Sequence, residues 1–268
     1  MMPFGFLRLA VAVMLVFITG CATGPNANPA DPLEPMNRSI SKFNDAVDDA
    51  VLKPMATGYK AVVPSPIRQG VTNFFNNIGD VWSMFNHVLQ FEIVNAGKTA
   101  ARLGINTILG LGGIFDIATD AGITPPKADL GQTLGKWGVP SGPYVVIPIL
   151  GPSSARDGVG TVTATYYDPL YNSVFDNATR NVLTVTRIVD VRSQLLNATD
   201  AVDGIALDKY TFVRDVYLKR RQSIINPQAQ KTTPEEDIDY SAEDPAKPTP
   251  DQSLPKLPTI PLPTIILR

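Results

Sequence analysis

The 268-residue chain has a single cysteine and a single histidine, and this scarcity excludes several kinds of chemistry. One cysteine cannot form an internal disulfide or a zinc site built on several cysteines. The lone histidine, His87, falls between Phe85 and Leu89 in an apolar helical pattern, so we expect a structural role for it rather than a catalytic one. The net charge of -2 lacks the basic excess that DNA or RNA binding requires, so we expect no nucleic-acid partner.

Motifs for catalysis and for cofactor binding are also missing. The stretch from Gly151 to Ala155 is similar to the turn that carries a hydrolase serine, but it ends in alanine where that turn has glycine. Three acidic residues have the spacing of a solvated helix face rather than of a metal site: Asp45, Asp48 and Asp49. We expect no metal, no cofactor and no enzymatic activity. A phospholipase that uses Ser153 is kept as an alternative.

The start of the chain has the pattern of a lipoprotein leader. The apolar run from Leu9 to Ile18 is too short to span a bilayer of about 30 Å as a helix. The next residues, Thr19-Gly20-Cys21, fit the lipobox, in which the cysteine receives a diacylglycerol, and Ala22 favours sorting to the outer membrane. We therefore expect residues 1–20 to be a removed signal peptide, Cys21 to be the lipid anchor and residues 21–30 to be a tether.

Apolar residues at helical spacing predict several helices in the first half of the folded body. Asp31 is the expected N-cap of the first helix, and Pro54 is expected to end it. A second helix should start at Ser65, and Asp80 should cap a third. The same spacing predicts a further helix from Ile93 to Leu109.

Small residues and tryptophans in this half each allow two interpretations. Gly97, Ala101 and Gly104 would permit either a tight helix crossing in a soluble core or contact with lipid. Trp82 and Trp137 would suit either the headgroup level of a membrane or a core position.

The second half of the body should be irregular first and helical afterwards. Glycines and prolines break the region from residue 110 to 152 into short pieces around an extended run from Tyr144 to Ile149. Helices are expected from Asp176 to Ala198 and from Ile205 to Ile225, with Lys219, Arg220 and Arg221 in the last turn. The sequence thus predicts an all-α domain over residues 31–226. The acidic, proline-rich tail, 227–268, is expected to be disordered.

Three blocks of sequence form the most specific pattern in the chain. The first contains Asp31, Pro32, Glu34, Asn37, Arg38, Phe43 and Asn44, the second contains Asn106, Gly110 and Asp116, and the third contains Gly131, Gln132, Gly135, Trp137, Arg156 and Asp157. Together they resemble the signatures of the MlaA family of outer-membrane lipoproteins, also called VacJ. The resemblance covers residues 31 to 225 and leaves out the tail.

The resemblance implies a fold and a function. Members of this family are ring-shaped, mostly helical proteins embedded in the inner leaflet of the Gram-negative outer membrane, with a central amphipathic channel. Phospholipid that has strayed into the outer leaflet would enter the channel and pass to a periplasmic carrier similar to MlaC, which preserves lipid asymmetry. Association with a trimeric porin is also implied. Broad apolar helix faces agree with burial against acyl chains.

A glycine- and proline-rich loop is the expected gate of this channel. It runs from Gly138 to Gly151 and includes Gly142, Pro143, Tyr144 and Pro148. Phe43 and Asn44 would hold the first helix beside it, and deleting both should leave a folded protein that leaks lipid in the wrong direction. The alternative function is a structural lipoprotein that binds porins or peptidoglycan.

Overall fold

The computed structural model describes residues 31–170 and 176–227. The expected signal peptide, lipidated Cys21, tether and most of the tail lie outside these residues. The first half holds α2 (Glu34–Val47), the π-helical turn η1 (Asp48–Leu52), α3 (Lys53–Val62), α4 (Ser65–Leu89), α5 (Ile93–Ile108), α6 (Ile117–Asp120) and α7 (Leu130–Lys136). The second half holds β1 (Tyr144–Ile147), β2 (Gly151–Ser154), α8 (Ala155–Tyr166), α9 (Asn177–Ile205) and α10 (Lys209–Ile225).

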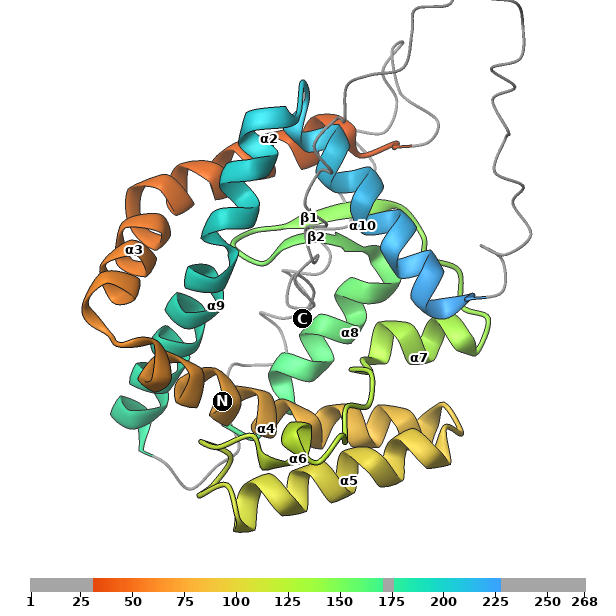
Figure 1. Ribbon diagram of the computed structural model, residues 1–268. Helices are drawn as coiled ribbons and strands as arrows, with labels where there is room; N and C mark the ends of the chain where they lie inside the picture. Colours follow the sequence, from red (N-terminus) through yellow and green to blue (C-terminus); the bar gives the residue numbers. More distant parts are fainter. Residues whose placement is uncertain (1–30, 171–175, 228–268) are drawn as a thin grey trace, which may run out of the picture.

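The helices follow one another around a ring (Figure 1). α2 and α3 form one side, the α4–α5 pair forms the base, and α7 and α10 form the opposite side. The β1–β2 hairpin and α8 lie within this outline in the same view, while α3 packs against α9 and α7 packs against α8. This arrangement confirms the expected mostly helical, ring-shaped body.

The first helix begins close to the expected place but without the expected cap. α2 starts at Glu34, and no side chain caps it. The carboxylate of Asp31 instead accepts hydrogen bonds from the Tyr210 hydroxyl at 2.5 Å and from Arg214 at 3.2 Å. Glu34 pairs with Arg38 at 2.7 Å. The capping prediction was wrong because a partner 179 residues away competes for the same carboxylate.

Pro54 does not end the first helix. The turn before it widens into η1, in which the Lys53 amide donates to the Asp48 carbonyl five residues earlier. A proline has no N–H and its ring clashes with the carbonyl four residues back, so a wider turn accommodates it where a regular α-helix would break. The chain continues as α3 to Val62.

The predicted break at Asp80 is also absent. α4 runs without interruption through 25 residues, and Asp80 lies buried in its interior. Its carboxylate pairs with Arg102 at 3.1 Å and with Lys127. The following helix, α5, confirms the prediction for residues 93 to 109 within one residue.

The small residues of α5 are not at a helix crossing. A Cβ atom placed at Gly97 or Gly104 would meet no heavy atom within 4 Å, and Ala101 is exposed. The interpretation of a tight crossing in a core is therefore wrong for these residues.

In the irregular middle of the chain, the predicted extended run is confirmed in its first four residues, which form β1. The sequence patterns did not predict its pairing into a hairpin or the helix α8 that follows. β1 and β2 pair antiparallel, with Tyr144 opposite Ser154 and Ile147 opposite Gly151. Gly151 has a φ of 85°, which a residue with a side chain adopts only with strain, and it completes the hairpin turn. The hydroxyl of Ser154 then caps α8 by accepting from the Asp157 amide at 3.2 Å.

The last two helices differ from prediction at their ends. α9 extends to Ile205 rather than to Ala198, and α10 begins at Lys209 with Asp208 as its cap. The prediction of Lys219, Arg220 and Arg221 in the last turn was wrong, because α10 continues to Ile225 and its last turn has no basic residue. Arg221 is only 5% exposed and forms ion pairs in the interior. Tyr210 and Tyr217, seven residues apart on α10, are both buried.

Polarity is distributed in the opposite way from that of a water-soluble domain. The ten largest fully buried side chains are all polar or charged, with His87 and Asn37 at the head of the set. Only 13 hydrophobic residues of the described chain are buried, whereas 32 large hydrophobic side chains are exposed. Interiors of soluble domains are mostly apolar. Hydrogen bonds and ion pairs therefore hold this ring together. Across residues 31–170 and 176–227, none of the helices combines the length and the apolar character needed to cross a bilayer.

Candidate functional site

Two asparagines of α2 hold the hairpin. Asn37 donates to the Tyr144 carbonyl and accepts from the Val146 amide, both at 2.9 Å. Asn44 donates to the Ile147 carbonyl at 3.1 Å and accepts from the Ile149 amide at 2.7 Å. Residues seven positions apart share one helix face, so both side chains reach the same strand. Their amides satisfy backbone groups of β1 and its turn in the way that a neighbouring strand would.

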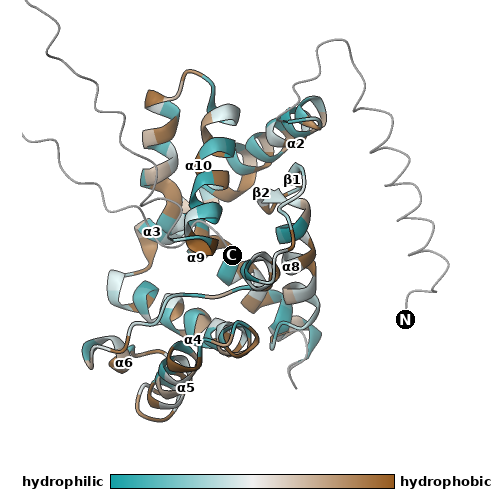
Figure 2. Cartoon of the chain, turned by 90° about the vertical axis from the view of Figure 1, so that its right-hand side faces the viewer, coloured by the Kyte–Doolittle hydropathy of each residue, from teal (hydrophilic) through white to brown (hydrophobic). Residues whose placement is uncertain are grey.

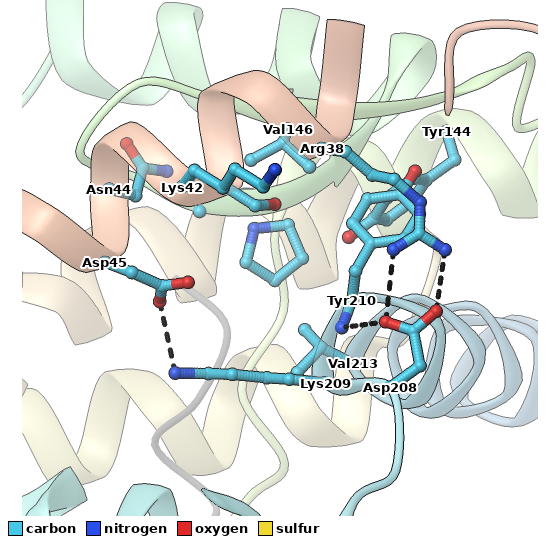
Figure 3. Close-up of a pocket in the computed structure, with 13 residues that line it drawn as sticks. Arg38, Lys42, Asn44, Asp45, Tyr144, Val146, Asp208, Lys209, Tyr210 and Val213 are labelled. Atoms are coloured by element: carbon cyan, nitrogen blue, oxygen red, sulfur yellow. Dashed lines mark hydrogen bonds and ion pairs between the residues drawn. The ribbon is translucent and has the colours of Figure 1, made fainter. Parts of the chain in front are cut away.

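A pocket of ≈ 270 Å³ opens between α2, the hairpin and the start of α10 (Figure 3). Lys42, Asn44 and Asp45 line it from α2, and Val146 lines it from β1. Lys209 enters it from α10 and pairs with Asp45 at 3.1 Å. The pocket therefore places charged side chains beside an apolar wall.

Arg38 is held firmly at the edge of this pocket. Its guanidinium binds both carboxylate oxygens of Asp208, at 2.6 and 3.1 Å, and lies 4.4 Å from the centre of the Tyr210 ring. The hydrogen bonds from Arg38 and Thr211 hold the pKa of the Asp208 carboxyl far below its ordinary value. Asp208 thus stays ionised, and Arg38 has its charge matched.

A second pocket of ≈ 260 Å³ adjoins the first on the η1 side. Both pockets are lined by Asn44, Asp45, Gly151 and Lys209. The second is more acidic, since its lining also includes Asp48, Asp49 and Asp203. Asp48 pairs with Arg192 at 2.6 Å, which ties η1 to α9.

The first sequence block meets α10 around the buried Asp31. Besides Tyr210 and Arg214, its carboxylate accepts from Asn37 at 3.3 Å. Burial and the neighbouring Asp31 raise the pKa of the Tyr210 hydroxyl, so this hydroxyl stays protonated and donates. Pro32 lies in the turn before α2. The buried cluster of Tyr144, Val146, Tyr210 and Tyr217 packs beside it.

The second block surrounds Asp116. Its carboxylate accepts from Arg102 at 2.6 Å and from Asn106 at 3.0 Å, and it caps α6 through the Thr119 amide. Burial raises the pKa of Asp116, but these hydrogen bonds outweigh it and lower the pKa to about 2. Gly110 belongs here because an added Cβ would lie 2.5 Å from the Asn106 carbonyl oxygen.

The third block surrounds Arg221. Its guanidinium binds Asp129 at 2.7 Å and Asp157 at 2.9 Å, and Tyr217 also donates to Asp157 at 2.7 Å. Burial raises the pKa of Asp157, but the charge and hydrogen bonds of Arg221 outweigh it and lower the pKa. Gly131 is required because a Cβ there would lie 2.4 Å from an Asp157 oxygen.

The other residues of this block support the same cluster. Arg156 donates to Asp157 at 3.0 Å and to the Val139 carbonyl at 3.2 Å, and Gln132 donates to Asp129 at 2.8 Å. Gly135 lies against Ile225 and Arg156. Trp137 is exposed, not part of a core, and donates to the Leu89 carbonyl at 3.0 Å.

The two residues expected to hold the first helix beside the gate are placed differently. Asn44 binds the hairpin within the loop, whereas Phe43 is 52% exposed. In the loop, Gly138 and Gly142 have positive φ, the Pro143 carbonyl accepts from Ala155, Tyr144 is buried and Pro148 is exposed at the hairpin turn. A gating role for these residues stays a prediction.

Sequence reasoning missed the α10 side of the site. Asp208, Lys209 and Arg214 reach α2 only because the chain closes into a ring. Asp208 carried one local signal, since an acidic residue before an apolar helical pattern is a typical N-cap. That signal predicts the start of a helix, but it does not identify Arg38 as the partner of Asp208.

The residues considered for chemistry are placed in structural roles. His87 is buried, with its two ring nitrogens 2.9 Å from Glu92 and 2.8 Å from the Pro126 carbonyl oxygen. Ser153 is buried in β2, and its hydroxyl lies 3.3 Å from the Ser154 carbonyl oxygen. Within the described residues no group of three or more acidic, histidine or cysteine side chains is arranged to hold a metal ion.

Known proteins are similar to this chain in sequence and in fold. Residues 29–224 match the family described as MlaA lipoprotein. The intermembrane phospholipid transport system lipoprotein MlaA of Escherichia coli is 33% identical over 230 residues, which cover 82% of this chain and 89% of that protein. The Haemophilus influenzae protein of the same name is 31% identical over 226 residues, covering 81% and 90%. An uncharacterised protein of Rickettsia typhi is 33% identical over 196 residues, covering 73% and 78%.

A solved structure agrees with these sequence matches. It was described in a study of the structural basis for maintenance of bacterial outer membrane lipid asymmetry. It superposes with a TM-score of 0.63 at 33% identity and covers 73% of this chain and 99% of its own. Together with the match over residues 29–224, this shows that the chain belongs to the MlaA lipoprotein family.

Proposed function

We propose that this protein removes mislocalised phospholipid from the outer leaflet of the outer membrane and passes it to a periplasmic carrier. Transport would run toward the inner membrane and so maintain lipid asymmetry. Two of the relatives named above, those of Escherichia coli and Haemophilus influenzae, are phospholipid transport lipoproteins, and this chain covers most of their length. In this proposal Cys21 anchors the protein at the periplasmic face, and the carrier and a trimeric porin are its partners.

The observation that carries the proposal is the polar interior combined with the apolar exterior. Exposed apolar side chains cluster on α5 and the loops at its two ends (Figure 2). They include Phe91, Ile93, Val94, Ile108, Leu109 and Leu111. Water disfavours such a surface, whereas acyl chains favour it at about 25 cal/mol for each Å² removed from water.

A polar route is the other requirement of the proposal. Moving a phospholipid headgroup through hydrocarbon without partners costs several kcal/mol at least. The two adjoining pockets beside α2 and η1 offer charged and amide side chains next to apolar ones. The amide of Asn44 lines both pockets and also holds the hairpin, which supports the hairpin as the movable wall of this route.

The test is the amount of phospholipid on the surface of cells that lack the protein. We expect deletion of the gene to raise surface-exposed phospholipid and detergent sensitivity, and the full chain to restore both. A structural lipoprotein that only binds porins or peptidoglycan predicts altered permeability with unchanged surface phospholipid. That outcome would overturn the proposal. Loss of function in a Ser153→Ala variant, with labelled lipid hydrolysed by the wild type alone, would instead support the phospholipase alternative.

A further inference from the structure

The two pockets beside α2 and η1 differ in charge. The first is lined by three cationic residues, Arg38, Lys42 and Lys209, and by two carboxylates, Asp45 and Asp208, which leaves one positive charge in excess. Since Arg38 pairs with Asp208 and Lys209 pairs with Asp45, the excess charge belongs to Lys42.

Lys42 is available to a ligand. In the described part of the chain it has neither an ion pair nor a hydrogen bond, and no dashed line reaches it in Figure 3. Its neighbours in the lining include Val146, Pro152 and Val213, which offer an apolar wall. An unpaired ammonium beside apolar side chains suits an anion that carries hydrocarbon, because both parts of such a molecule then find partners.

The second pocket has the opposite charge. Four carboxylates line it, Asp45, Asp48, Asp49 and Asp203, against three cationic residues, which leaves one negative charge in excess. Asp45 and Asp203 bind Lys209, and Asp48 binds Arg192. The third cation, Lys53, pairs with Asp200 outside the lining at 3.0 Å. Asp49 has no hydrogen bond or ion pair among the residues that the structure describes.

The two unmatched charges belong to one continuous helical stretch. Lys42 lies in α2 and Asp49 lies in η1, seven residues later, so they project from nearly the same face about 10 Å apart along the axis. The long, flexible side chain of Lys42 can extend toward the same ligand as the shorter Asp49. Two of the lining residues common to both pockets, Asn44 and Asp45, lie between these positions in the sequence.

We propose that the two pockets together select a zwitterionic phospholipid headgroup, with its phosphate bound at Lys42 and its ammonium bound at Asp49. This inference rests on the proposed transport function and names its preferred substrate, a phosphatidylethanolamine-type lipid. The phosphate of any phospholipid can bind Lys42. Only a headgroup with a cation also finds a partner in the acidic pocket, since the neutral glycerol of phosphatidylglycerol leaves Asp49 unmatched.

The experiment measures which lipid the purified full-length lipoprotein retains. The protein is incubated with nanodiscs that contain equal amounts of phosphatidylethanolamine and phosphatidylglycerol with identical acyl chains, and the bound lipid is extracted and quantified by mass spectrometry. We expect wild type to hold about tenfold more phosphatidylethanolamine, the effect of one charge-assisted contact.

Two variants separate the roles of the two charges. Asp49→Asn should bring the lipid ratio to about one, because bound phosphatidylethanolamine falls about tenfold while bound phosphatidylglycerol stays the same. Lys42→Gln should lower both lipids about tenfold. The matched control is Lys98→Gln, because Lys98 is also exposed and unpaired in the described chain but lies on α5, outside both pockets. All three substitutions are at exposed positions, and circular dichroism verifies their folding.

The outcomes distinguish this inference from the proposal on which it rests. Equal retention of the two lipids by wild type, unchanged in Asp49→Asn, would overturn headgroup selection and leave phospholipid transport standing. Retention of neither lipid by a folded wild-type protein would contradict both. An equal loss in Lys98→Gln and Lys42→Gln would overturn the assignment of phosphate binding to this pocket.

Discussion

Arg221 illustrates how single residues hold this interior together. Its guanidinium is 5% exposed and matches two carboxylates, Asp129 and Asp157, while Tyr217 donates to one of them. Removing one partner of such a group leaves the others buried with uncompensated charge, which costs more than the pair contributes. The strength of the interior therefore depends on keeping these clusters complete.

Replacing Arg221 with leucine should destabilise the fold strongly. The expected loss is about 3–5 kcal/mol, because Asp129 and Asp157 would lose their shared cation. Thermal unfolding in detergent, followed by circular dichroism, measures it. Lys219→Leu is the matched control, since Lys219 is exposed two residues earlier on α10. Equal melting temperatures for the two variants would show that the cluster is not important for stability.

The ionised carboxylate of Asp116 makes the stability of the fold depend on pH in the acidic range. Its pKa in the fold, about 2, lies below the ordinary 3.8, so its contribution is complete above pH 4 and is lost as the pH falls toward 2. Wild type should melt at a higher temperature than Asp116→Asn at pH 6, and the gap should close by pH 2. A gap that stays constant from pH 6 to pH 2 would contradict the ionised state of Asp116.

The family resemblance, rather than local spacing, indicated which positions matter, and neither showed what they bind. The three sequence blocks were found from the sequence, and the structure places Asp31, Asp116 and Asp157 at the centres of buried clusters. Asp31 was expected to cap a helix because its neighbours fit that pattern. Its real partners, Tyr210 and Arg214, are too distant in sequence for any local rule to find.

At the scale of elements, α2 and the hairpin behave as one unit. Asn37 and Asn44 hold the strand at two points two helical turns apart. Asn37 is fully buried. Asn44 is partly exposed, lies beside the hairpin turn and lines both pockets. We therefore expect the inner contact to stabilise the fold and the outer one to limit the motion of the turn.

Asn44→Ala should loosen the hairpin turn without unfolding the protein. The Ile149 amide would lose its acceptor, so its hydrogen exchange should become faster, and surface phospholipid in cells should rise while the melting temperature stays near that of wild type. Ser39→Ala, on an exposed position of the same helix, serves as control. Wild-type exchange and wild-type surface phospholipid in Asn44→Ala would remove the hairpin from the gating proposal.

Helix periodicity predicted α5, which has a clear apolar face. It also predicted α9 and α10, although the hydrophobic residues of these two helices are spread around the helix rather than gathered on one face. It failed at Pro54, where a π-helical turn accommodates the proline within the helical stretch. It also failed at Asp80, whose carboxylate pairs with Arg102 instead of capping a helix. The sequence patterns also missed α8, whose two glycines and three threonines have low helix propensity. Each failure lies where tertiary contacts override local preference.

At the scale of the whole molecule, the ring brings together the first and the last helix of the described residues. α2 meets α10 through Asp31, Arg38 and their partners, and the two pockets lie beside this junction. Composition predicted an apolar protein without catalytic chemistry, but the closure of the ring is not encoded in any local segment. The resemblance to a known family supplied it, and the structural match agrees with it.

The most direct test of the central claim, that phospholipid enters this ring beside α2, is photo-crosslinking in living cells. A benzoylphenylalanine is placed either at Ser41, which lines the first pocket, or at Val94, which lies on the exposed apolar face of α5. We predict that labelled phospholipid is captured at both positions. Capture at Val94 with none at Ser41 would contradict the claim, because the protein would then sit in lipid without admitting it.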